Sequence, residues 1–376
     1  MHVALNAWFW NRPDTGSGQY VRHLVRALAG VAPHLTLTLI APRGWSIEPP
    51  EGVHVRYVPL RGSGHRHKVR FEQQAVPRAA AQAGADLLHV PYWGAPLRSP
   101  VPVAVTIHDL IPLVLPAYRG GVLARLYTGL VAASAHGAAV IIADSEATRA
   151  DILQRLALPP EQVHVVPLAA GEQYRPDSDE ETGSGVRRKY GLPDEYVLYL
   201  GGYDVRKNIG TLLKAFTYVR EGRDIPLVLA GRLPETITPR FDDVPALIEA
   251  MRLGEAVRLI GPVEEADKPA IYRMASCFVF PSRYEGFGLP VLEAMACGTP
   301  IVTTSASSLP EVAGEAGFTV DPDDARGMAG AILAILTQED LAASLRERGL
   351  RHAAQFSWER AARQTLTLYE QTLAGC

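Results

Sequence analysis

The stretch SRYEGFGLPVLEA, residues 282–294, places a carboxylate on each side of a glycine-bracketed turn. Pro290 suits the first position of a helix, because the N–H that it lacks is not needed there. Glu293 then falls one turn inside that helix, while Glu285 stands before the turn. Backbone N–H groups at the start of a helix favour an anion. The residues expected to offer such groups are Gly286, Phe287, Gly288 and Leu289.

Two adjacent cations, Arg206 and Lys207, follow the glycine-ended run LYLGG and precede a helical pattern. Arginine offers a planar fork and lysine a point charge to phosphate oxygens, so together they could neutralise a diphosphate. A merely solvated pair is less favoured, because cations near a helix N-terminus oppose its dipole. Two carboxylates would repel a diphosphate unless they face hydroxyls, from which they accept hydrogen bonds readily. We therefore expect Glu285 and Glu293 to face sugar hydroxyls; the alternative is that they only complement the helix dipole.

Polar residues also follow two strand-like runs in the first half of the chain. His108 and Asp109 end the run VPVAVTIHD, where they could orient hydroxyls or handle a proton. The alternative is that Asp109 caps a turn while His108 packs. Gly16 and Gly18, in NRPDTGSGQYVRHL, stand at the mouth of a helix and could favour an anion, or form a flexible loop. A third glycine of the dinucleotide fingerprint is missing, which disfavours hydride transfer.

Short β-branched runs alternate with longer amphipathic ones along the chain, as in βα units with parallel sheets. Such sheets bind ligands outside the carboxyl ends of their strands, where the candidate residues fall. The predicted strands are 2–8, 35–41, 53–60, 86–90, 101–109, 138–145 and 163–169, then 196–202, 225–231, 256–263, 277–282, 299–304 and 318–321. Predicted helices include 18–30, 146–157 and segments beginning at 208, 290, 308 and 324.

The length of 376 residues favours two domains. The acidic segment GEQYRPDSDEETGSG, residues 171–185, has no apolar period and is the best linker candidate. We predict an N-terminal Rossmann-like domain over 1–176 and a C-terminal one over 177–357. The last helical pattern, 358–376, is expected to pack back on the first domain.

The bulk composition is that of a folded globular protein, with 47% hydrophobic and 20% charged residues. A net charge of -3 argues against nucleic acid as the main partner. Cys277, Cys297 and Cys376 show no paired spacing, which fits a reducing, cytoplasmic setting. The chain start lacks a basic leader, and the longest apolar run is interrupted by His136, so we expect neither export nor a membrane span.

A basic segment, RGSGHRHKVRF, could face a phosphorylated lipid-linked acceptor or the inner face of an anionic membrane, giving peripheral association. A solvated basic loop is an equal alternative. Its cationic and titratable residues are Arg61, His65, Arg66, His67, Lys68 and Arg70.

Taken together, EGFGLPVLE, RKN after a glycine-ended strand, HDLIP and ADSEATRADI resemble the family 4 retaining glycosyltransferases. The resemblance runs over most of the chain, and the two-glutamate motif followed by LEAMACGTPIVTT is highly specific. It implies a GT-B fold, in which two Rossmann-like domains face a cleft. It also implies a nucleotide-sugar donor on the C-terminal domain and a glycan or lipid-linked acceptor mainly on the N-terminal one.

The resemblance also assigns roles to residues. Glu293 matches the glutamate that holds the ribose hydroxyls, and Glu285 the one that faces the donor sugar. Arg206 and Lys207 match the basic pair on the diphosphate, and His108 a histidine near the transferring sugar. The backbone contacts to sugar and phosphate match Phe287, Gly288 and Leu289, and the glycine loop that closes on the donor matches Gly16 and Gly18. Some relatives carry arginine where Gly202 stands, which changes the division of labour among the cations.

No cofactor or metal is expected, because enzymes of this kind generally need none. The Asp-x-Asp strings at Asp177–Asp179 and Asp321–Asp323 are interpreted as structural, and the cations would take the role of a metal on the departing phosphate. HDLIP and RKN look most like mannosyltransferases that use GDP-mannose, and donors of glucose, rhamnose or N-acetylglucosamine are the alternatives. The alternatives are another GT-B enzyme, such as a nucleotide-sugar epimerase or a phosphorylase, and a protein that binds nucleotide sugars without turnover.

Overall fold

The computed structural model describes residues 1–59, 64–176 and 180–375. The chain divides into two compact units, residues 1–168 with 357–376 and residues 169–356. The first division falls between Leu168 and Ala169, whereas the sequence places it between 176 and 177.

A seven-stranded parallel sheet forms the centre of the first unit, in the order β3-β2-β1-β4-β5-β6-β7. Each strand predicted for this half is present and begins or ends within a few residues of its predicted bounds. The strands are β1 (His2–Asn6), β2 (Thr36–Pro42), β3 (Val53–Val58), β4 (Leu87–Val90), β5 (Val103–Ile107), β6 (Val140–Ala143) and β7 (Val163–Val165).

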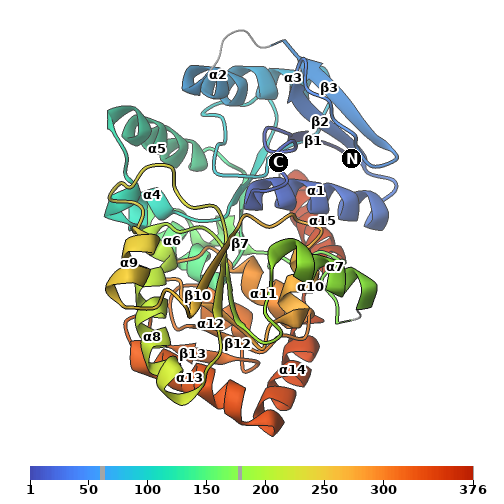
Figure 1. The fold of residues 1–376 in the computed structure, drawn as a ribbon. Helices are drawn as coiled ribbons and strands as arrows, with labels where there is room; N and C mark the ends of the chain where they lie inside the picture. Colours follow the sequence, from blue (N-terminus) through green and yellow to red (C-terminus); the bar gives the residue numbers. More distant parts are fainter. Residues whose placement is uncertain (60–63, 177–179, 376) are drawn as a thin grey trace. The chain divides into compact units, whose positions relative to one another are not determined.

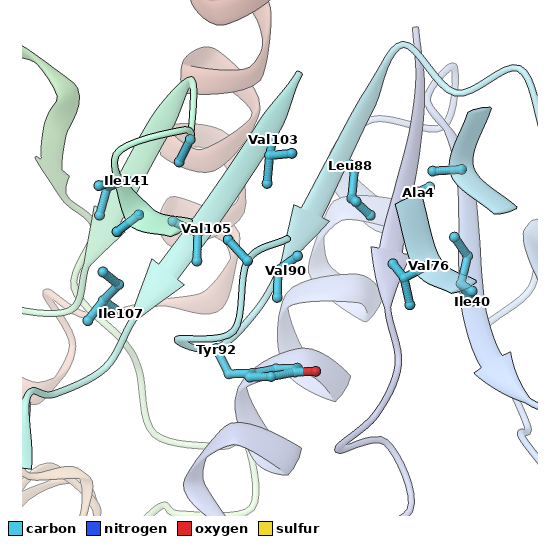
Figure 2. Close-up of a cluster of buried hydrophobic side chains, with 14 of the residues drawn as sticks. Ala4, Ile40, Val76, Leu88, Val90, Tyr92, Val103, Val105, Ile107 and Ile141 are labelled. Atoms are coloured by element: carbon cyan, nitrogen blue, oxygen red, sulfur yellow. The ribbon is translucent and has the colours of Figure 1, made fainter. Parts of the chain in front are cut away.

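Helices cover both faces of this sheet, which explains why its strands β4, β5 and β6 are buried along their whole length. One face packs into a core with α3 and α5, and Figure 2 shows Val90, Val105 and Ile107 within it. The helices of the unit are α1 (Gly16–Val31), α2 (His65–Arg70), α3 (Val76–Gln82), α4 (Ile111–Val114), α5 (Val122–Ala135), α6 (Glu146–Leu156) and α15 (Trp358–Ala374), with a π-helical turn over Phe71–Ala75 and 3-10 turns over Pro116–Tyr118 and Pro160–Gln162.

The opposite face carries α1 and α15, which lie side by side (Figure 1). Helix α15 is capped at its start by Ser357, whose hydroxyl accepts from Arg360 N at 3.1 Å. Near its other end, the Tyr369 hydroxyl lies 2.6 Å from His89 Nδ1 on β4, and His89 Nε2 lies 2.9 Å from Thr106 Oγ1 on β5. The predicted return of the last helix to the first domain is therefore confirmed.

The second unit repeats the plan with six parallel strands in the order β10-β9-β8-β11-β12-β13. All of its predicted strands are present: β8 (Val197–Leu200), β9 (Leu227–Ala230), β10 (Val257–Gly261), β11 (Cys277–Phe280), β12 (Ile301–Thr304) and β13 (Phe318–Val320). The helices are α7 (Glu180–Tyr190), α8 (Ile209–Gly222), α9 (Val244–Ala250), α10 (Lys268–Met274), α11 (Leu289–Ala296), α12 (Leu309–Ala313), α13 (Ala325–Thr337) and α14 (Glu339–Ala353), with a 3-10 turn over Val205–Lys207.

The predicted linker, residues 171–185, is wrong in part. Tyr174 is buried in the second unit and its hydroxyl donates to Glu265 at 2.8 Å. From Glu180 the chain forms α7, which packs against α10 through the buried Val186 and a hydrogen bond from the Tyr190 hydroxyl to Asp267. A helix with two glycines and so few apolar side chains has little period to detect. Asp177 and Asp179 lie outside the described residues.

Hydropathy along the described helices gives one further finding. None of them is by itself long and apolar enough to cross a membrane. One strongly bent pair, 325–337 with 339–374, meets the criteria of length and composition only when its two parts are taken together.

Candidate active site

In each sheet the strand order reverses direction once, between β1 and β4 in the first unit and between β8 and β11 in the second. Ligands of open parallel sheets bind at such reversals, outside the carboxyl ends of the strands. In the second unit Arg206 and Lys207 follow β8, and Glu285 follows β11. Three of the predicted candidates of this half, Arg206, Lys207 and Glu285, therefore meet at the expected place.

Glu285 bridges the two cations. One of its carboxylate oxygens lies 2.6 Å from Arg206 Nη1 and the other 2.6 Å from Lys207 Nζ. Arg206 also contacts Asp204 Oδ1 through Nε at 3.2 Å and donates to the Tyr284 carbonyl at 3.2 Å. The side chains of Glu285, Arg206 and Lys207 are only 12, 16 and 10% exposed, so water screens these contacts weakly.

This arrangement sets the protonation of the group. Burial alone would raise the pKa of Glu285, but Lys207 and Arg206 outweigh it and lower that pKa to about 2. Burial lowers the pKa of the Lys207 ammonium, and the nearby Glu285 carboxylate offsets part of this lowering. With Asp204 included, two negative and two positive charges stand together, so the cluster is close to neutral. From the sequence we predicted that Arg206 and Lys207 bind a phosphate and that Glu285 faces hydroxyls. In this structure Glu285 instead contacts both cations.

Two serines that the sequence interpretation missed shape the turn after Glu285. Ser307 Oγ accepts from Glu285 N at 2.8 Å and donates to its carbonyl at 2.9 Å. Ser308 Oγ lies 3.0 Å from the Glu285 carbonyl and 2.7 Å from that of Phe287. The turn ends at Gly288, whose φ of 109° favours glycine, and α11 begins without a side-chain cap. The turn and its amides therefore stand at a helix start, as predicted.

Glu293 lies in a different environment, inside α11 and 5% exposed. The Tyr272 hydroxyl donates to its Oε2 at 3.0 Å. Burial raises the pKa of Glu293 to about 7, with Lys268 acting in the opposite direction. The two predicted carboxylates therefore differ in protonation. Glu285 is ionised at neutral pH, whereas Glu293 gains or loses its proton close to neutral pH.

In the first unit His108 is fixed by partners outside its own strand. Its Nδ1 lies 2.7 Å from Asp144 Oδ2 at the end of β6, and its Nε2 lies 3.2 Å from the Pro91 carbonyl. Asp144 raises the pKa of His108 against the lowering effect of burial. Because both partners are acceptors, the doubly protonated ring satisfies both contacts. Asp109 instead accepts from Ile111 N at 3.0 Å, which is the turn-capping alternative.

The N-terminal glycines Gly16 and Gly18 have distinct surroundings. Gly18 N donates to the side chain of the helix cap Thr15 at 3.2 Å, and a Cβ at Gly18 would stand 1.9 Å from the Arg12 carbonyl oxygen. A Cβ at Gly16 would meet nothing within 4 Å. The close backbone packing therefore requires a glycine at position 18, independently of any ligand. A role of Gly16 or Gly18 in donor binding stays a prediction.

A second polar cluster lies at the β1/β4 reversal of the first unit, and Lys68 of the basic segment is the one member that the sequence analysis named. Asn6 at the end of β1 donates to the Tyr92 hydroxyl at 2.8 Å. The buried Glu72, on the π-helical turn, pairs with Lys68 at 2.6 Å and accepts from the Tyr127 hydroxyl at 3.1 Å. The sequence signal that could have indicated this cluster is the pair of polar residues Asn6 and Tyr92, in the runs LNA and VPY at the ends of β1 and β4.

The basic segment is therefore only partly a solvated loop. Lys68 lies in α2, 20% exposed, and its Nζ approaches the Tyr127 hydroxyl at 2.6 Å. Arg66 and Arg70 are exposed on the same helix. Arg61 lies outside the described residues.

The described residues contain no group of three or more His, Cys, Asp or Glu side chains arranged to hold a metal. Of the second Asp-x-Asp string, Asp323 pairs with Arg283 at 2.6 Å, and Asp321 Oδ1 accepts from Asp323 N at 2.8 Å. Asp324 then caps α13 by accepting from Gly327 N at 2.9 Å. These contacts agree with the structural interpretation of that string.

Comparison with protein-family models matches both units. Residues 15–169 match the model described as Glycosyltransferase Family 4, and residues 186–352 match the model described as Glycosyl transferases group 1. An O-antigen chain mannosyltransferase B of Escherichia coli is 35% identical over 302 residues, which are 78% of this chain and 77% of the relative.

The chain belongs to glycosyltransferase family 4.

Other relatives of this glycosyltransferase agree. An MMP alpha-(1->4)-mannosyltransferase of Mycolicibacterium hassiacum is 30% identical over 300 residues, covering 77% of this chain and 69% of the relative. The solved sucrose-phosphate synthase of Thermosynechococcus elongatus covers 100% of both chains with a TM-score of 0.80 and 23% identity. The protein thus has the predicted GT-B fold and is a hexosyltransferase.

The glycine pair gives a first prediction. Gly18→Ala should lower the free energy of unfolding by about 3 kcal/mol or more, because the new methyl group overlaps a backbone carbonyl that cannot move away cheaply. Gly16→Ala is the matched control and should change it by less than about 1 kcal/mol. Urea unfolding monitored by circular dichroism measures both. Equal stability of the two variants would contradict the packing described for Gly18.

Glu293 gives a second prediction. Its folded pKa of about 7 lies above the ordinary value of 4.5, so the native state holds a proton that the unfolded chain releases. Stability should therefore fall as pH rises from about 5 to 7 and stay low above that, with about 1.4 kcal/mol lost for each pH unit that separates the two pKa values. Glu293→Gln should remove this part of the decline. Denaturant unfolding of both proteins at pH 5 and pH 8 is the measurement; parallel losses in both would exclude Glu293 as the source.

Proposed function

We propose that the enzyme transfers mannose, with retention of anomeric configuration, from GDP-mannose to a glycan or lipid-linked acceptor. The observation that carries the proposal is the Arg206–Lys207 pair beside the Gly286–Leu289 turn at the strand-order reversal of the second unit. Cations and helix-start amides at such a place suit a diphosphate. Mannose is favoured because two relatives at 30 and 35% identity carry mannosyltransferase names.

Donor binding would rearrange charges within the cluster. The diphosphate brings negative charge to Arg206 and Lys207, whose partner in the described structure is Glu285. Glu285 would then leave the cations and accept hydrogen bonds from hydroxyls of the donor sugar. The exchange keeps the buried cations paired before and after binding, and hydrogen bonds from the sugar hydroxyls replace the cations around the Glu285 carboxylate.

Glu293 would hold the ribose hydroxyls. A carboxyl whose pKa lies near 7 can be neutral beside the donor, in which case it donates one hydrogen bond as well as accepting others. A neutral acid also avoids repulsion of the neighbouring diphosphate. Tyr272, which already donates to Glu293, would fix the orientation of the carboxyl.

In the transfer step, the bond between the anomeric carbon and the diphosphate oxygen breaks while the acceptor hydroxyl oxygen bonds to that carbon. Retention without an attacking side chain requires the acceptor to approach from the leaving-group side. The proton of the hydroxyl then passes to the departing phosphate oxygen, which is the nearest base. Arg206, Lys207 and the turn amides would stabilise the developing charge, the role that a metal takes in other transferases.

His108 would act by charge and position in this scheme. Both of its ring nitrogens face acceptors, Asp144 and the Pro91 carbonyl, so it holds no lone pair with which to remove a proton. A cationic ring near the donor sugar would favour a negatively charged leaving group. We further propose a cytoplasmic enzyme that needs no metal and does not bind nucleic acid.

The role of Lys207 is testable. Lys207→Ala, and Lys207→Met, which keeps most of the apolar stem, should each lower kcat about 10²- to 10³-fold, as expected for the loss of one preorganised donor. Lys214→Ala, an exposed lysine on α8, is the control and should not change kcat. Steady-state transfer assays give the rates, and circular dichroism confirms folding of each variant. Wild-type turnover in the folded methionine variant would remove Lys207 from the mechanism.

The identity of the nucleotide is tested by thermal shift. A ligand that binds the native state raises Tm in proportion to RT ln(1 + [L]/Kd). GDP at a given concentration should therefore raise Tm more than UDP or ADP does. A larger shift with UDP would refute GDP-mannose as donor while leaving glycosyl transfer intact.

A further inference from the structure

Helix α5 presents apolar side chains to solvent over its first turns. Val122, Leu123 and Leu126 are 71, 77 and 65% exposed, and no other large apolar side chain among the described residues is as exposed. Leu126 follows Val122 by four residues and Leu123 by three, which places the three side chains on one side of the helix start. Single exposed leucines are ordinary, but three within five residues form a patch, and such patches mark interaction sites.

The rest of α5 is anchored. Val131, Ser134 and Ala135 near its end are buried in the first unit, and Trp93 Nε1 donates to the Val131 carbonyl at 3.1 Å. Tyr127, in the middle of α5, accepts a hydrogen bond from Lys68 of α2 at 2.6 Å, which links the two helices at this point. The buried second half of α5 thus holds the exposed patch at the start of the same helix in place.

The charged residues of the segment that carries the patch are all arginines. Residues 110–143 contain no aspartate or glutamate, and Arg119 and Arg125 are exposed on either side of Val122. The neighbouring α2 adds the exposed Arg66 and Arg70. An apolar patch accompanied by arginines complements a surface that is apolar below and anionic above.

We propose that the first half of α5 docks on the surface of an anionic lipid bilayer. Val122, Leu123 and Leu126 would enter the boundary between headgroups and acyl chains, while Arg119 and Arg125 reach the lipid phosphates. A second copy of the chain fits less well, because three apolar side chains cover far less than the roughly 800 Å² per partner of a stable dimer. The proposal goes beyond the transfer reaction and does not depend on the donor.

This surface differs from the one that the sequence predicted. The basic segment 61–70 contributes Arg66 and Arg70, but the side chain of Lys68 is bound to Glu72 and Tyr127 and is not available to a lipid. The apolar part of the surface comes from α5, some fifty residues further along the chain, which no motif indicated.

The test is co-sedimentation of the full chain with vesicles of phosphatidylcholine, with and without phosphatidylglycerol. The wild type should bind the anionic vesicles, and less at high salt. Leu123→Ser with Leu126→Ser should weaken binding about tenfold for each leucine. Arg119→Gln with Arg125→Gln should weaken it about fivefold for each arginine on anionic vesicles only. Ile237→Ser with Leu259→Ser removes exposed apolar residues of the second unit and is the matched control.

Equal sedimentation of the leucine variant and the wild type would overturn the proposal, as would a wild type that fails to bind. So would a concentration-dependent dimer, seen by size exclusion, that the leucine substitutions dissociate without any change in vesicle binding. Transfer to a soluble acceptor, measured alongside, should be unchanged in the leucine variant. Loss of transfer chemistry and loss of lipid binding are thereby read separately.

Discussion

The site of the second unit depends on the contact of Glu285 with Arg206 and Lys207. Each of the three side chains is mostly buried, and a buried charge without a partner costs several kcal/mol. The bridge therefore keeps two cations in a place where either alone would be unfavourable. It also means that an anionic ligand competes with an internal acid, so affinity reflects the difference between two pairings.

Sheet topology places this contact. The strands β8 and β11 are parallel neighbours, but the chain after β8 crosses to β9 and the chain after β11 crosses to β12, on opposite sides of this pair. The two loops therefore separate, which opens the space that the charged side chains occupy. The turn after β11 is then fixed by Ser307 and Ser308 through backbone atoms. Because backbone contacts hold the turn, the side chains that it presents can change partners without disturbing the sheet.

Sequence reasoning found what is local. Strands, helix starts and the motif residues after β8 and β11 are visible because each depends on neighbours in the chain. What it missed depends on pairing across the chain. Asp144 meets His108 only because β5 and β6 are adjacent, and Ser307 reaches Glu285 from the segment after β12, the strand that pairs with β11. Helix α7 was taken for a linker because α10, rather than its own sequence period, supports it.

The two glutamates of the motif show how position decides chemistry. Eight residues apart, one has a pKa of about 2 and the other of about 7. The difference arises because Glu285 stands before the turn among cations, whereas Glu293 lies inside α11 beside a tyrosine hydroxyl. Environments that separate the pKa values of paired acids also separate their roles. One glutamate is then a permanent anion that needs cations or hydrogen-bond donors around it, and the other is a carboxyl that can donate or accept a hydrogen bond as its neighbour requires.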